Sequence, residues 1–211
     1  MQASVHLYET HQQASLAAAN AVAAGLRRLI AERGRAIGVF SGDASQAELL
    51  NHLANADGIE WTRVIGFHTF ELLGADEGAP HSQRKVLFDH LVYRVPMVEF
   101  HGLRGEAANP EAVCANYAAL LKTRPPDFAI LSLSEDVCTP LAPLADSEET
   151  SLVRSLKAGK MGSVLSLTAG VFQKCSQLFV LASRTPDIAD LPASLKTHAG
   201  LHIFAAKELQ R

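Results

Sequence analysis

The sequence contains little cysteine: Cys114, Cys138 and Cys175 are the only three in 211 residues. An odd number of widely spaced cysteines excludes a disulfide framework, and no two of them have the spacing of a metal-ligand pair. Reduced thiols are typical of a reducing compartment. We therefore expect a cytoplasmic protein.

Histidines are more numerous, but they do not indicate a metal centre. Of the nine histidines, His68, His81, His90 and His101 are spaced too loosely for a ligand motif. We expect no metal, and the sequence indicates no other cofactor.

The chain also lacks a dominant charge and an uninterrupted apolar run. The formal net charge is −3, and the basic residues form no stripe with interleaved aromatics, so we expect no nucleic-acid partner. The longest apolar stretch, 164–182, is interrupted by Gln173, Lys174 and Gln177, which excludes a membrane-spanning helix there. Residues 1–13 lack the basic and apolar regions of a signal peptide.

The remaining composition is that of a globular domain. Hydrophobic residues make up 48% of the chain and charged residues 19%, and a chain of this length can bury a full core. We find no repeat and no long linker. The sequence therefore predicts one domain over residues 1–211.

Helical and strand patterns alternate along the chain. We expect helices over 15–33, 44–54, 84–91 and 110–122, and strands over 36–40, 61–67, 97–101, 127–133, 164–167, 178–182 and 201–205. Residues 151–160 are predicted as a surface helix or loop, and 169–175 as a short helix or turn. The alternation predicts an α/β fold, a three-layer α/β/α sandwich with a mostly parallel, Rossmann-like sheet.

Four segments follow predicted strands and are the places to expect a ligand. They are 41–45, 68–74, 132–143 and 182–185. In open α/β sheets, ligands bind outside the carboxyl ends of the strands.

Three of these segments carry a resemblance to a known family. Residues 39–46, V-F-S-G-D-A-S-Q, are similar to a strand followed by S-G-G-S-T-P. Residues 67–75, F-H-T-F-E-L-L-G-A, are similar to F-x-x-D-E-Y-x-G-L, and residues 127–139 to D-L-x-L-L-G-x-G-x-D-G-H-x-A. From the first helix to about residue 209, the chain resembles the glucosamine-6-phosphate isomerase and 6-phosphogluconolactonase family. The helix that carries Cys114 and Tyr117 favours the isomerase branch.

The resemblance implies that the first loop binds the phosphate of a sugar 6-phosphate. The loop consists of Ser41, Gly42, Asp43, Ala44 and Ser45. Asp43 stands where the family has a second glycine, and a carboxylate beside a phosphate is repulsive unless it is protonated or paired. The alternative role for Asp43 is a turn or N-cap residue before the following helix.

The resemblance also assigns the general base of the isomerases, the aspartate of D-E-Y, to the position of Phe70. Phenylalanine cannot accept a proton. Glu71 matches the neighbouring glutamate and is the candidate substitute, if it reaches the proton. The alternative is a solvated loop carboxylate.

In the G-x-D-G-H motif, the glycines correspond to Ser132 and Ser134, the aspartate to Asp136 and the histidine to Cys138. In the family this histidine assists ring opening or lactone hydrolysis. Asp136 and Cys138 are therefore candidate catalytic residues. A cysteine is a nucleophile only with a lowered pKa and a nearby base, and the alternative is a small buried apolar residue.

Basic residues near the strand ends are candidates to hold the phosphate or to line the cleft. They are Arg84, Arg154, Lys160 and Arg184. The alternative for each of them is a solvated surface charge.

Three functional hypotheses follow from the resemblance. The first is a carbohydrate-metabolism protein similar to glucosamine-6-phosphate isomerase (deaminase), acting on or binding a sugar 6-phosphate. The second is a hydrolase of the 6-phosphogluconolactonase type, and the third is a non-catalytic relative that binds a metabolite or a protein partner. We expect a small-molecule ligand and no membrane partner. Members of this family often form homo-oligomers, and a homo-oligomer is therefore possible for this chain.

Overall fold

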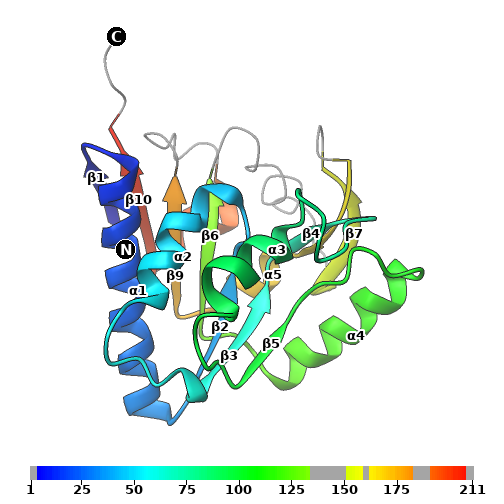
Figure 1. Ribbon diagram of the computed structural model, residues 1–211, viewed down its shortest axis with the longest axis horizontal. Coiled ribbons are helices and arrows are strands. Elements are labelled where there is room, and N and C mark those ends of the chain that lie inside the picture. The colour runs from blue at the N-terminus through cyan, green and yellow to red at the C-terminus, as the bar shows by residue number, and fades with distance from the viewer. Residues whose placement is uncertain (1–3, 134–150, 159–161, 183–190, 208–211) are drawn as a thin grey trace.

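The computed structural model of the chain describes residues 4–133, 151–158, 162–182 and 191–207 (Figure 1). Its central strands are β1 Ser4–Tyr8, β2 Ala36–Phe40, β3 Val64–His68, β5 Glu99–His101, β6 Phe128–Leu133, β9 Gln177–Ala182 and β10 Leu201–Ala206. They form one seven-stranded sheet in the order β1-β10-β9-β6-β2-β3-β5, and every pairing is parallel. β2 and β6 are buried along their whole length, as strands of a parallel sheet covered on both faces should be.

Helices cover both faces of this sheet. They are α1 His11–Arg33, α2 Ala47–Ala54, α3 Gln83–Leu87, α4 Pro110–Thr123, α5 Ala169–Phe172 and α6 Ala193–Lys196, with a π-helical turn at Phe88–Val92 and 3-10 turns at Ala44–Gln46 and Trp61–Arg63. Figure 1 shows α1, α2 and α3 in front of the sheet and α4 at the right, beyond β5.

Two apolar cores lie on the two faces of the sheet. Phe40 on β2 joins the core formed with α1 and α2, whereas its neighbour Val39 joins the core that contains Tyr117 and Leu121 of α4. Successive residues of a strand point to opposite faces. These two cores confirm the predicted three-layer α/β/α sandwich with a parallel sheet.

The long first helix is defined at both ends by local signals. Thr10 caps its start, because the hydroxyl accepts a hydrogen bond from Gln13 N at 3.1 Å. Gly34 ends it in the left-handed conformation, with φ of 75°. Both are preferred end signals of an α-helix.

A second, smaller sheet packs beside the first. It contains β4 Phe70–Leu72, β8 Ser163–Leu167 and β7 Val153–Lys157, in the order β4-β8-β7 with antiparallel pairing. The prediction of a surface helix or loop over 151–160 is therefore wrong where the structure describes it. β7 shows no clean alternation of apolar and polar residues, and its hydrogen bonds to β8 make it a strand.

Other differences from the predictions also involve strands. β1 and β4 were not predicted. β1 is a short edge strand whose Val5 and Leu7 alternate with polar residues but stay exposed, and β4 is only three residues long. Residues 61–63 form a 3-10 turn, so that β3 begins at Val64. The segment 164–167 is a strand, but in the small sheet.

The order of the strands reverses between β2 and β6. From β2 the chain continues to β3 and β5 on one side, whereas β9 and β10 lie on the side of β6. Such a switch point opens a crevice at the carboxyl ends of the strands, where ligands bind in this class of fold.

Candidate functional site

The switch point brings together two serines from separate predicted ligand-binding segments. Ser41 follows β2 and Ser132 lies near the end of β6, and their hydroxyl oxygens are 3.2 Å apart in a buried setting. The two predicted ligand-binding segments therefore meet at one point of the sheet.

Asp43 occupies the start of the helical turn that follows the first loop. Its carboxylate accepts a hydrogen bond from Ser45 N at 3.0 Å and another from the Ser45 hydroxyl, while Ala44 faces solvent. Asp43 is thus the N-cap residue of this turn. A carboxylate of the chain itself lies where a helix N-terminus would attract a bound anion.

Gly42 allows close packing between the first loop and α3. A Cβ atom added at Gly42 would overlap the backbone carbonyl of Gln83, the first residue of α3. The glycine therefore has a packing role here, whether or not the loop binds a phosphate.

We expect Gly42→Ala to lower the free energy of unfolding by about 1–3 kcal/mol, because the overlap with a backbone atom forces α3 to move. Gly170→Ala is the matched control, since the nearest atom to its added Cβ is 3.7 Å away. Urea denaturation of both variants measures the difference. Equal stability of the two variants would contradict the close approach of α3.

Phe70 lies in the interior of the small sheet. Its side chain is 3% exposed and packs with Ala158 and Val164. On β4 it pairs in register with Ser166 of β8. Phe70 is therefore an apolar core residue.

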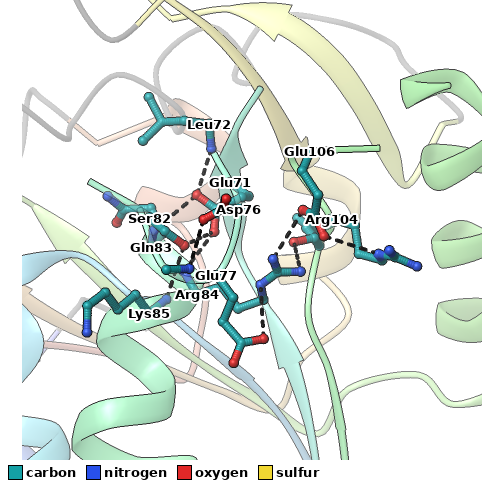
Figure 2. A network of polar contacts seen from close by, with 12 residues as sticks. Glu71, Leu72, Asp76, Glu77, Ser82, Gln83, Arg84, Lys85, Arg104 and Glu106 are labelled. Carbon is teal, nitrogen blue, oxygen red and sulfur yellow. Dashed lines mark hydrogen bonds and ion pairs between the residues drawn. The ribbon is translucent and has the colours of Figure 1, made fainter. Parts of the chain in front are cut away.

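Glu71 is fully buried, with 0% of its surface exposed, so the alternative of a solvated loop carboxylate is wrong. Figure 2 shows its carboxylate at the centre of a polar network at the start of α3. It accepts hydrogen bonds from Leu72 N at 2.9 Å, Gln83 N at 3.0 Å, Arg84 N at 2.8 Å and the Ser82 hydroxyl at 2.9 Å.

The four hydrogen-bond donors around Glu71 determine its role. Burial raises its pKa, and the hydrogen bonds from the three backbone N–H groups and from Ser82 oppose that rise. The carboxylate links β4 to the first turn of α3, where backbone N–H groups lack partners within the helix. Serving as a general base would require Glu71 to leave these donors.

Arg84 is also buried, so the alternative of a surface charge is wrong for this residue. Its guanidinium donates a hydrogen bond to Glu106 at 3.1 Å (Figure 2). It also donates to the carbonyl of Leu103 at 3.4 Å. Glu77 lies 3.9 Å from Nε, which is an ion pair but too long for a hydrogen bond. The Nε atom itself has no hydrogen-bond partner.

His68 was not among the predicted site residues. It ends β3 and is 0% exposed, and neither ring nitrogen has a hydrogen-bond partner. Burial, with a smaller effect of the Arg84 charge, lowers its pKa to about 3. The available signal was its position, because His68 begins the segment 68–74 that follows a predicted strand.

A scan against protein families matches residues 9–186 to the family described as glucosamine-6-phosphate isomerases/6-phosphogluconolactonase. This match spans most of the chain and agrees with the motifs at the ends of β2, β3 and β6. The chain belongs to this family. No curated protein matches the sequence.

Solved structures of the glucosamine-6-phosphate isomerase and 6-phosphogluconolactonase family have the same fold as this chain. A monomeric glucosamine-6-phosphate deaminase aligns with a TM-score of 0.79 and 13% identity, over 97% of each chain. The 6-phosphogluconolactonase from Thermotoga maritima aligns with a TM-score of 0.81 and 15% identity, over 97% of this chain and 99% of the other. The 6-phosphogluconolactonase from Shewanella baltica aligns with 0.80 and 16%, over 99% and 98%.

Several candidate residues of the family's later motifs lie outside the described residues: Ser134, Asp136, Cys138, Lys160 and Arg184. Arg154 lies on β7, opposite Ser166 in register and partly buried. It therefore lies in the small sheet, on the far side of Ser166 from Phe70.

The two cysteines that the structure describes are not activated nucleophiles. Cys114 and Cys175 are free and buried, and burial raises the pKa of both thiols, that of Cys175 to about 12. Among the described residues, no three His, Cys, Asp or Glu side chains gather to hold a metal ion. Within the same residues, no helix is long and apolar enough to cross a membrane.

Proposed function

We propose that this chain binds a sugar 6-phosphate, or a closely related metabolite, at the carboxyl ends of β2, β3 and β6, without the proton transfer of the family's isomerases. The observation that carries the proposal is Phe70. The position that resemblance assigns to the isomerase base holds a phenylalanine packed into the small sheet, which can neither accept nor deliver a proton.

The neighbouring carboxylate does not replace the missing base. Each carboxylate oxygen of Glu71 already accepts two hydrogen bonds, from β4 and the start of α3. A general base must lie within hydrogen-bond reach of the proton that it removes. Glu71 is therefore assigned a structural role in this proposal.

Binding is supported by the family and by the site at the switch point. The chain belongs to a family named for enzymes of two sugar phosphates, and its switch point presents hydroxyl groups from Ser41 and Ser132. The capping carboxylate of Asp43 repels a phosphate and so weakens its binding at this loop. We also propose a cytoplasmic location, supported by the free thiols of Cys114 and Cys175.

We expect glucosamine 6-phosphate, fructose 6-phosphate or 6-phosphogluconate to raise the melting temperature of the protein without being converted. A ligand at 100 times its dissociation constant stabilises the native state by about 2.7 kcal/mol, or several degrees for a domain of this size. Thermal melts with each compound, and with its dephosphorylated form, measure binding. Assays at high protein concentration for ammonia release from glucosamine 6-phosphate, and for hydrolysis of 6-phosphogluconolactone to 6-phosphogluconate, measure conversion.

The variant Asp43→Asn tests whether the phosphate of the ligand binds at the first loop. Asparagine is as good an N-cap as aspartate, so the variant retains the turn and removes only the charge. If a phosphate lies at this loop, its affinity should rise about tenfold, or roughly 1.4 kcal/mol. Conversion of any of these compounds by the wild-type protein would overturn the proposal that the chain is non-catalytic. If the protein binds none of them, the proposal that its ligand is a sugar phosphate is wrong.

A further inference from the structure

The described residues contain a group of buried polar atoms without hydrogen-bond partners. Those nearest the ends of β2 and β3 belong to Gln46, His68, Thr69, Gln83 and Arg84. In native proteins the large majority of buried polar atoms have a partner, so each exception requires an explanation. His68 lies close enough to Arg84 for the guanidinium charge to act on the imidazole, and Gln83 packs against Gly42 of the first loop. Unpaired polar atoms at these positions are candidates for contacts with a ligand.

His68 is the strongest exception in this group. Both of its ring nitrogens are without a partner, and no part of the residue is exposed. Other large buried side chains on this face, such as Phe40 and Leu87, are apolar. A phenylalanine or leucine at position 68 would avoid the desolvation of an unpaired imidazole. Retaining such a group is typical of a functional site, where stability is given up for binding.

The backbone around His68 is held rigidly. The hydroxyl of Tyr117 accepts a hydrogen bond from His68 N at 2.7 Å and donates to the carbonyl of His101 at 2.7 Å. The next residue, Thr69, donates its N–H to Phe40 O at 3.1 Å. Phe40 lies opposite His68 in register and directly precedes Ser41 of the first loop. His68 is thus fixed to the strand end that leads into the candidate site.

The chemistry of the group matches a sugar hydroxyl. A neutral imidazole offers one donor and one acceptor, and a hydroxyl group can both donate and accept. The Thr69 hydroxyl and Arg84 Nε also lack hydrogen-bond partners, although Nε forms a long ion pair with Glu77. The hydroxyl can donate or accept, and Nε is a further donor. Burial, and to a smaller extent the positive charge of Arg84, opposes protonation of His68 and lowers its pKa, so the imidazole stays neutral and does not act as a phosphate-binding cation.

We propose that His68 is a ligand-binding residue of this chain and that it hydrogen-bonds to the hydroxyl groups of the bound sugar, with Thr69 and Arg84 beside it. This inference rests on the proposed function, because it names the group that recognises the sugar part of the same ligand. His68 contributes to affinity for the polyol and not to affinity for the phosphate.

The test compares His68→Phe with His68→Gln in binding 6-phosphogluconate, glucosamine 6-phosphate and gluconate by calorimetry. His68→Phe should weaken the binding of all three at least tenfold, because it removes both polar atoms. His68→Gln retains a donor and an acceptor and should bind within about threefold of wild type. His198→Gln is the matched control, since His198 bonds to the carbonyl of Cys175 before β9, at the opposite end of the strands, and should bind as wild type does.

Nitrogen NMR of the imidazole supplies a second measurement that needs no variant. Adding 6-phosphogluconate to wild type should shift both His68 ring nitrogen resonances. If wild type binds a sugar but His68→Phe binds it equally well, or the ring resonances do not move, His68 contacts internal water only and the inference is overturned. If wild type binds none of the three compounds, the proposed function fails, and this inference fails with it.

Discussion

Replacing Glu71 with glutamine should lower the free energy of unfolding by about 3 kcal/mol, the scale expected when one partner of a buried charged network is lost. Glutamine keeps the size of the side chain but turns an NH2 group toward donors that need an acceptor. Three of those donors are the backbone N–H groups of Leu72, Gln83 and Arg84, and the fourth is the hydroxyl of Ser82. A buried donor without an acceptor costs about 1–3 kcal/mol.

Urea denaturation at pH 7 measures the effect of Glu71→Gln. Glu60→Gln is the control, because Glu60 is exposed and forms only a surface ion pair with Arg63, where substitutions usually change stability by less than about 0.5 kcal/mol. A loss below about 1 kcal/mol for Glu71→Gln would mean that Glu71 is free to take another role, and its candidacy as a base would return.

This result bears on how the family motif is interpreted. Position 70 has lost the residue of the isomerase base, whereas Glu71 keeps the neighbouring glutamate of the motif. The network explains the difference, because Glu71 connects β4 to the start of α3 and can be needed without any catalysis (Figure 2). Retention of Glu71 is therefore no evidence for an active isomerase.

Acidification should destabilise the wild-type protein through His68. Its pKa is lowered from 6.5 to about 3 in the folded state, so the unfolded chain binds a proton first as the pH falls. The stability linked to His68 is fully present above pH 6.5 and is lost progressively between pH 6.5 and 3. At pH 5 the loss from this residue amounts to about 2 kcal/mol, at roughly 1.4 kcal/mol per pH unit.

His68→Phe removes this contribution. The free energy of unfolding of wild type minus that of the variant should fall by about 2 kcal/mol from pH 7 to pH 5. The difference isolates His68 from His101 and His202, whose pKa values burial also lowers. Glu71 acts in the opposite direction, because a raised carboxyl pKa favours the folded state at low pH. A pH-independent difference between wild type and variant would show that His68 titrates normally.

The sequence alone determined the elements whose signals are local. The end of α1 at Arg33, before Gly34, was predicted, although the helix begins at His11 rather than at residue 15. The continuous apolar runs of β2 and β6 indicate a sheet covered on both faces. These signals work because helix ends and strand burial depend on neighbouring residues. Residue identity alone also excluded a base at Phe70, since no environment gives phenylalanine a titrating proton.

Only the tertiary structure decided which polar side chains are buried and what they contact. Glu71 is bound by a helix start 11 to 13 residues later in the chain, and Ser41 meets Ser132 across a separation of 91 residues. β1 is a strand because it pairs with β10 at the far end of the chain. The local sequence pattern indicates which face of a helix or strand is apolar. The hydrogen-bond partner of a buried polar group, in contrast, comes from segments that only folding brings together. That is why the roles of Glu71, Arg84 and His68 emerged from the structure.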